Sequence, residues 1–169
     1  MDLYLKMLSG KDVTQGYVDW FSEKEVVRFS DNQFRSFTVR GQIQYVEECR
    51  SNKDMVLFGI FDGNIHVGNI SINGIRSPHR RAEITYVVGN SSYWGKGIAS
   101  YAISEVIIIS AQEYNLNKLV AGVAEHNTAS ARVLNKNGFV LEGIRKKHLF
   151  FDGKFTNQLD YGLLLNEKP

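Results

Sequence analysis

The sequence predicts an α+β protein built on a mixed, mostly antiparallel twisted sheet. Two apolar runs, 55–61 and 66–75, flank Asp62 and Gly63, a pair that favours a tight hairpin turn. A third strand-like run follows at 82–88, and from there strand-like and helix-like runs alternate to the C-terminus. A strand meander followed by β-α-β-α-β implies one parallel strand pair. We expect about seven strands flanked by about four helices, in a single domain covering 1–169.

The N-terminal part of the chain is predicted to supply one strand and two helices. The strand covers 3–8, and the first helix covers 11–21 with a further turn at 23–28. The second helix begins at Thr38, a residue type suited to an N-cap. The stretch 29–37 between the helices mixes polar and aromatic residues, so it is predicted to be a loop. Its aromatic side chains either line a substrate site or anchor the loop to the core.

Two periodic patterns assign side chains to faces of these elements. In the second helix, Ile43, Val46 and Cys49 recur at helical spacing and are expected on one face. In the run 82–88, alternation places Glu83, Thr85 and Val87 on one face and Ile84, Tyr86 and Val88 on the other, with Tyr86 assigned to the core.

The C-terminal half is predicted to alternate between helices and strands. A helix covers 97–114 and a short apolar strand covers 118–124, as expected at the centre of a sheet. Asn127 is a candidate N-cap for a helix over 128–137, which ends at a glycine. A last hairpin turns at Asp152 and Gly153.

The composition excludes several classes of function. The net charge of +2, without a block of like charges, argues against nucleic-acid binding. Cys49 is the single cysteine, and His66, His126 and His148 have no metal spacing, so neither a disulfide framework nor a metal site is expected. The sequence has neither a signal-peptide pattern nor an apolar run of membrane-spanning length. We therefore expect a cytoplasmic protein that binds neither nucleic acid nor membrane.

The stretch 92–100 lies between a predicted strand and a predicted helix and contains Gly95 and Gly97. Glycines two apart, leading into a helix, allow backbone N–H groups to approach a ligand closely. The helix adds unpaired N–H groups and the positive end of its dipole, a combination that binds phosphate. An ordinary strand-to-helix turn would show the same glycine spacing.

The order of elements and three motifs resemble the GNAT superfamily of acyl-CoA-dependent N-acetyltransferases, and most closely its RimJ/RimL-type branch. Residues 93–99, YWGKGIA, resemble that branch's pyrophosphate loop, with Trp94 where the superfamily more often carries Gln or Arg. Residues 127–139 resemble the pattern N-x-x-S-x-x-x-x-x-K-x-G-F, about 30 residues downstream. Residues 143–145 and the hairpin at 152–154 resemble the branch's C-terminal pattern.

The resemblance implies that two neighbouring strands splay apart and hold acetyl-CoA between them. Its pyrophosphate would lie on backbone N–H groups of the glycine loop, and its pantetheine arm would pair with the strand before that loop. The implied cofactor contacts are Val87, Val88, Trp94, Gly95, Lys96, Gly97, Ile98, Ala99, Ser100, Asn127 and Lys136. Asn127 could equally serve only as the helix N-cap.

Two residues are candidates for catalysis. Glu83 is the candidate general base that takes a proton from the acceptor amine, and the alternative is an ion pair with Arg80 or Arg81. His79, in the adjacent loop, is an alternative base. Ser130 is the candidate acid toward the CoA thiolate, because Leu134 stands where many relatives carry a tyrosine. The alternative for Ser130 is a hydrogen bond to the helix backbone. The resemblance also implies that a backbone N–H, expected at Val87, holds the oxyanion.

The implied reaction is acetyl transfer to a primary amine by direct attack in a ternary complex, in a monomer or homodimer. Residues 17–20, Tyr-Val-Asp-Trp, resemble acetyltransferases of surface-polysaccharide pathways, which favours a small or nucleotide-linked amino sugar as the acceptor. The alternative acceptor is the α-amine of a protein N-terminus, as in the RimJ/RimL branch. A non-catalytic acyl-CoA sensor would also keep the glycine loop.

Overall fold

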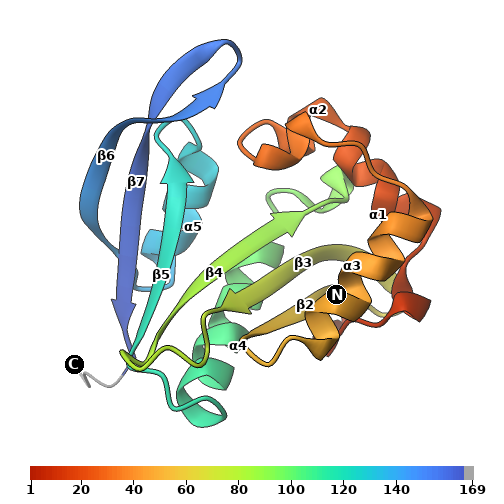
Figure 1. The fold of residues 1–169 in the computed structure, drawn as a ribbon, viewed down its shortest axis with the longest axis horizontal. Coiled ribbons are helices and arrows are strands. Elements are labelled where there is room, and N and C mark those ends of the chain that lie inside the picture. The colour runs from red at the N-terminus through yellow and green to blue at the C-terminus, as the bar shows by residue number, and fades with distance from the viewer. Residues whose placement is uncertain (166–169) are drawn as a thin grey trace.

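The computed structural model describes residues 1–165, which form one sheet with helices on both faces (Figure 1). The sheet has seven strands in the order β1-β2-β3-β4-β5-β7-β6, and β4–β5 is its parallel pair. The strands are β1 (Leu3–Met7), β2 (Met55–Asp62), β3 (Ile65–Asn73), β4 (Arg81–Val88), β5 (Lys118–Ala124), β6 (Val140–Phe151) and β7 (Lys154–Leu164). The α-helices are α1 (Gln15–Asp19), α2 (Lys24–Val27), α3 (Val39–Ser51), α4 (Ile98–Gln112) and α5 (Thr128–Lys136). The predicted α+β class and the single parallel pair are confirmed.

The helix predicted over 11–21 is broken into shorter pieces. A 3-10 turn at Gly10–Asp12 precedes α1, and another at Trp20–Ser22 follows it. Thr14 is extended, with φ −115° and ψ 166°, and its side chain accepts a hydrogen bond from Tyr17 N. A side chain that caps a new helix start competes with continuation of the previous turn, which explains the break.

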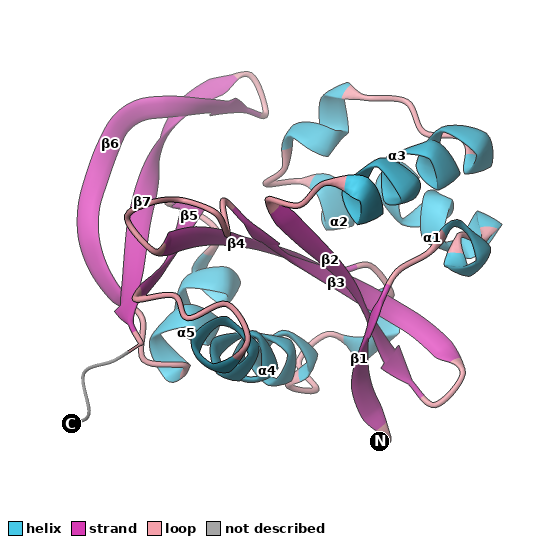
Figure 2. Cartoon of the chain, turned by 60° about the horizontal axis from the view of Figure 1, so that its bottom comes forward, coloured by secondary structure: helices cyan, strands magenta, loops and turns pink. Residues whose placement is uncertain are grey.

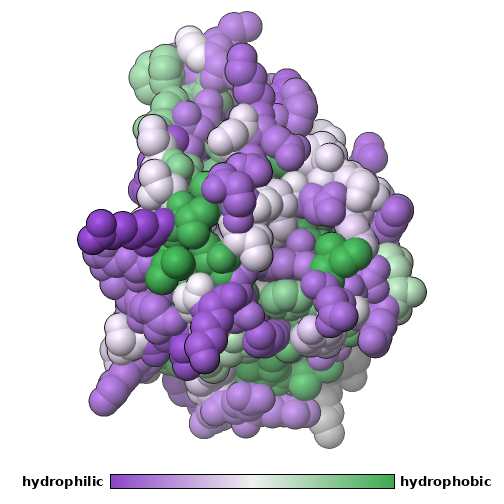
Figure 3. Space-filling model, turned by 90° about the vertical axis from the view of Figure 1, so that its right-hand side faces the viewer, coloured by the Kyte–Doolittle hydropathy of each residue, from purple (hydrophilic) through white to green (hydrophobic). Residues whose placement is uncertain are grey.

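Helices cover the two faces of the sheet in separate groups (Figure 2). The core under α4 and α5 contains Ile70, Ile84 and Leu134, whereas the core under α1 and α3 contains Tyr17 and Val46. Strand β2 faces both cores, because alternate side chains of a strand point to opposite sides of the sheet. The face that carries α1 and α3 is mostly hydrophilic on its outside, with hydrophobic side chains in separate patches (Figure 3).

Strands β4 and β5 pair only at their beginnings. The paired positions are Arg81 with Lys118, Ala82 with Leu119, and Glu83 with Val120. Beyond this point β5 remains paired with β7 along its whole length, while the two parallel strands diverge (Figure 1). The remainder of β4, 84–88, therefore has an edge without a partner strand, as the predicted splayed pair requires.

The C-terminal hairpin curves toward α2 and touches the segment that follows it (Figures 1 and 2). Asp152, with φ 51°, and Gly153, with φ 72°, form its turn, as the sequence predicts. Arg28 Nε lies 3.8 Å from Asp152 Oδ2, and the rings of Phe34 and Phe151 stack with centroids 6.4 Å apart. We call these two contacts the hairpin bridge. Within residues 1–165, no helix is long and apolar enough to cross a membrane.

Candidate active site

The glycine loop presents unobstructed backbone at the start of α4. Gly95 and Gly97 have φ values of 74° and 84°, which favour glycine, and no atom lies within 4 Å of where a Cβ would stand at either residue. Gly97 is the N-cap of α4 and supplies no side chain to cap the first N–H groups. The space that a Cβ would fill is therefore available to an anion at the positive end of a helix.

The side chains of the loop hold its shape. Trp94 Nε1 donates a hydrogen bond of 2.8 Å to the carbonyl oxygen of Val88. The ammonium of Lys96 lies 5.2 Å from the centroid of the Tyr93 ring, and Tyr93 donates to Asp62 at 3.1 Å. The tryptophan at this unusual position thus folds the loop back onto the end of β4.

Strand register decides which peptide groups of β4 are open. Val87 is opposite Asn69 of β3, and Gly89 N donates to Val67 O at 3.0 Å. Hydrogen-bonded and non-bonded positions alternate in an antiparallel pair, so the peptide groups of Val87 point toward β3. Those of Tyr86 and Val88 point to the unpaired edge. A pantetheine arm on this edge would meet the N–H of Val88, whose carbonyl already accepts from Trp94, and the peptide groups of Tyr86. This revises the expectation for the backbone of Val87.

Tyr86 reaches from β4 to the first turn of α5. Its hydroxyl lies 2.6 Å from Ser130 Oγ and 3.4 Å from the carbonyl oxygen of Ser130. Burial raises the pKa of Tyr86 to about 12, although the hydrogen bond with Ser130 opposes the rise. The sequence pattern places Tyr86 on the correct face but contains no sign of this contact with a residue 44 positions away.

Asn127 caps α5, because its Oδ1 accepts a 3.2 Å hydrogen bond from Ser130 N. The N-cap interpretation is confirmed, and a contact with the cofactor would fall to the amide nitrogen, which can still donate. Leu134, one helical turn after Ser130, is fully buried in the core. It therefore offers nothing to the divergent strands.

The ends of α4 and α5 meet near the glycine loop. Asn137 Nδ2 donates to Ser100 Oγ at 3.1 Å, so the residue after α5 touches the first turn of α4. Lys136 is exposed directly before this contact. Ile98 is buried, and Ala99 is half-buried, so both are placed to offer backbone rather than side-chain groups.

Glu83 lies on the opposite face from Tyr86, at the closed end of the divergent pair. Its side chain is exposed, and within residues 1–165 its carboxylate forms no ion pair. The suggested ion pair with Arg80 or Arg81 is absent, since the Arg80 guanidinium donates to the backbone and side chain of Asn115 instead. Beside Glu83 the sheet surface is polar, because Thr85 Oγ1 and Ser71 Oγ lie 2.7 Å apart.

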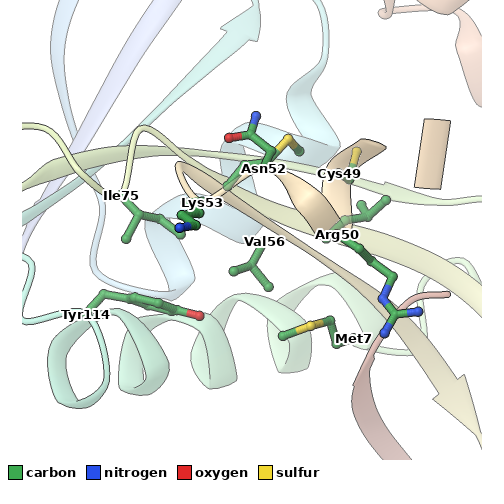
Figure 4. Close-up of a pocket in the computed structure, with 10 residues that line it drawn as sticks. Met7, Cys49, Arg50, Asn52, Lys53, Val56, Ile75 and Tyr114 are labelled. Carbon is green, nitrogen blue, oxygen red and sulfur yellow. The ribbon is translucent and has the colours of Figure 1, made fainter. Parts of the chain in front are cut away.

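Two further features were compared with the predicted site: metal-binding groups and a surface pocket. Residues 1–165 contain no group of three or more histidine, cysteine, aspartate or glutamate side chains that could hold a metal ion. A surface pocket of about 270 Å³ lies between the end of α3, the start of β2 and Tyr114 (Figure 4). Its lining includes Arg50, Lys53 and Ile75, and none of the predicted site residues.

Comparison with known proteins assigns the family. Residues 2–140 match the acetyltransferase (GNAT) domain, and the chain belongs to that family. It is 34% identical over 154 residues to the uncharacterized N-acetyltransferase p20 of Bacillus licheniformis, covering 88% of this chain and 85% of that protein.

Two solved structures share the fold. The ribosomal-protein-S5-alanine acetyltransferase of Vibrio fischeri superposes with a TM-score of 0.86 at 26% identity, over 100% of this chain and 97% of the other. The spermidine N-acetyltransferase of Vibrio cholerae, solved with CoA and spermine, gives a TM-score of 0.86 at 20% identity, over 97% and 96%. The chain is thus an acyl-CoA-dependent N-acetyltransferase, and its resemblance to the RimJ/RimL-type branch is supported.

Proposed function

We propose that the protein transfers the acetyl group of acetyl-CoA to a primary amine by direct attack in a ternary complex. The observation that carries this proposal is the open edge of β4 running into the uncapped start of α4. The pyrophosphate binds N–H groups at Gly95 and from Gly97 to Ser100, since the N–H groups of Trp94 and Lys96 already donate to the carbonyls of Ser91 and Tyr93. The pantetheine arm follows the edge from Val88 toward Tyr86. Lys136 and the amide of Asn127 complete the cofactor contacts.

Glu83 accepts the proton of the incoming ammonium, directly or through water. An amine is protonated near neutral pH and must lose a proton before it attacks a thioester. The exposed, unpaired carboxylate lies on the face away from α4, so the acceptor approaches from the side opposite the cofactor. The N–H of Tyr86 or Val88 on the open edge stabilises the oxyanion.

The proposed acceptor is a small or nucleotide-linked amino sugar. The hairpin bridge supports this choice, because Phe34 keeps 63% of its surface exposed and can stack on a sugar or base. Arg28, in the same bridge, can pair with an anionic group. The second candidate is the α-amine of a protein N-terminus, favoured by the likeness to the Vibrio fischeri enzyme.

Thiol release from acetyl-CoA in the presence of different amines tests both the reaction and the acceptor. The panel contains glucosamine, a nucleotide-linked amino sugar, spermidine and a peptide with an N-terminal alanine. We expect the largest kcat/KM with one of the amino sugars. Preference for the peptide would support the second candidate, and preference for spermidine would contradict both.

The same panel separates an enzyme from a sensor. Tight CoA binding by calorimetry, without thiol release above the rate in buffer for any amine, would favour a non-catalytic acyl-CoA-binding protein. Absence of CoA binding would overturn the cofactor assignment itself.

A further inference from the structure

Tyr86 and Ser130 form a hydrogen-bonded pair that the family resemblance does not assign. The pair joins β4 to α5 across the divergent side of the sheet, with 2.6 Å between the two hydroxyl oxygens. Leu134, at the position where many relatives carry a tyrosine, is fully buried and has no proton to donate. The phenol that lies next to the start of α5 in this chain therefore comes from the strand.

We propose that Tyr86 is a positioning residue that holds the Ser130 hydroxyl so that its proton points to the sulfur of the acetyl-CoA thioester. This inference rests on the proposed function. Tyr86 Oη also lies 3.4 Å from the carbonyl oxygen of Ser130, a group that can only accept. Either hydroxyl can donate across the 2.6 Å contact. In the arrangement in which Tyr86 donates to Ser130 Oγ, the proton of Ser130 is left for another acceptor, and the proposal concerns this arrangement.

The geometry of β4 places the sulfur near this pair. The arm that begins at the glycine loop passes Val88 first and then Tyr86, the next residue with peptide groups on the open edge. Ser130 lies at the N-terminal turn of α5, where the helix dipole also favours a developing negative charge. The side chains of Tyr86 and Ser130 are both half-buried.

The pair acts when the carbon–sulfur bond breaks. The neutral amine nitrogen forms a bond with the acetyl carbon, and the second proton that it must lose passes to water, because Glu83 already holds the first. The electron pair of the broken bond goes to sulfur, and the thiolate accepts a hydrogen bond from Ser130. Tyr86 fixes that donor through its own hydrogen bond, and solvent protonates the thiolate after CoA leaves.

A double-mutant cycle tests whether Tyr86 acts through Ser130. With acetyl-CoA and the best amine of the panel, we expect Tyr86→Phe to lower kcat about tenfold while KM for acetyl-CoA changes less than about twofold. In a Ser130→Ala background, Tyr86→Phe is expected to have no further effect on kcat. Tyr114→Phe is the control, since Tyr114 packs against the same core but lines the pocket beside α3. Equal losses in both backgrounds, or an effect on thermal stability alone, would overturn the proposal.

Titration of the thiol of bound CoA provides a readout that needs no acceptor. Ultraviolet absorbance of the thiolate is followed against pH for the complexes with CoA. Because a hydrogen bond stabilises the thiolate, Tyr86→Phe and Ser130→Ala should each raise the pKa of the bound thiol by about one pKa unit. An unchanged pKa in both variants would refute the pair's role even if acetyl transfer is observed. A wild-type protein that shifts the thiol pKa but transfers no acetyl would overturn the proposed function and leave the pair supported.

Discussion

The surroundings of Glu83 support its proposed role as the general base. Its carboxylate is exposed, lacks an ion-pair partner within the described residues, and faces a polar part of the sheet beside Thr85. No side chain of the described residues forms an ion pair with this carboxylate, so it is sterically accessible to an acceptor amine. Arg80 does not form an ion pair with this carboxylate, because its guanidinium donates to Asn115 instead.

Replacement of this carboxylate tests its role as the base. We expect Glu83→Gln to lower kcat about a hundredfold at neutral pH, with KM for acetyl-CoA unchanged. The loss should shrink as the pH rises, since a growing fraction of the acceptor amine is then deprotonated by solvent. Initial rates from about pH 6 to 10 measure both effects. Glu113→Gln, at the C-terminal end of α4, is the control. Full activity of Glu83→Gln across this range would rule out the role.

The residue types at the site could be predicted from the sequence, but their partners could not. Asn127 caps α5 as its residue type and position indicate, because a cap depends on neighbours within three residues. The contact of Tyr86 with Ser130 depends on how β4 and α5 are placed in three dimensions, and no local pattern encodes it. The same applies to Trp94, whose indole closes the loop onto the carbonyl of Val88.

Among the elements, the start of α3 agrees with the sequence-based prediction, whereas its buried face agrees only in part. Thr38 caps α3 by accepting from Gly41 N at 3.1 Å, as predicted. Of the face predicted for α3, Val46 and Cys49 are buried, whereas Ile43 remains 37% exposed. Gln42 is buried in its place because its amide donates to Tyr17 Oη at 2.8 Å. A pattern that counts only apolar positions cannot predict a buried polar residue whose partner lies on another helix.

The loop before α4 gives a prediction about an element and its backbone. Gly97→Ala should weaken CoA binding at least about tenfold, because the methyl group enters the space assigned to the pyrophosphate and the φ of 84° becomes strained. Gly63→Ala is a matched control, since Gly63 also has a positive φ, 54°, and open space at its Cβ position, but lies in the β2–β3 turn. Calorimetry with CoA measures the affinity and thermal unfolding measures the strain. Equal affinities for the two variants would argue against the loop as the phosphate site.

At the scale of the whole molecule, the sheet separates two groups of predicted site residues, one on each face. The core under α4 and α5 fixes the glycine loop and Tyr86, and the opposite face presents Glu83. The divergence of β4 from β5 is the single place where both sets can reach the same bond, because the sheet elsewhere is closed by paired strands. The order of elements predicted the parallel pair, whereas the point at which it opens, after Glu83, depends on packing across the sheet.

The hairpin bridge connects the segment after α2 with the turn between β6 and β7. Its ion pair, Arg28 with Asp152, is exposed and contributes little to stability. Its aromatic contact is asymmetric, since Phe151 is 7% exposed and Phe34 is 63% exposed. Phe151 thus anchors the contact, and most of the Phe34 ring stays accessible to a ligand.

Truncation of Phe34 tests this interpretation. We expect Phe34→Ala to raise KM for the acceptor about fivefold to tenfold, because about 1 kcal/mol of ring stacking with the acceptor is lost. KM for acetyl-CoA and the thermal stability should remain close to those of the unmodified protein, since the ring is mostly exposed and lies away from the glycine loop. Phe155→Ala is the control, because Phe155 is 67% exposed on the same hairpin but packs on Phe150 instead. If both variants change the acceptor KM equally, the hairpin bridge does not contact the acceptor, and the preference for an amino sugar loses its structural support.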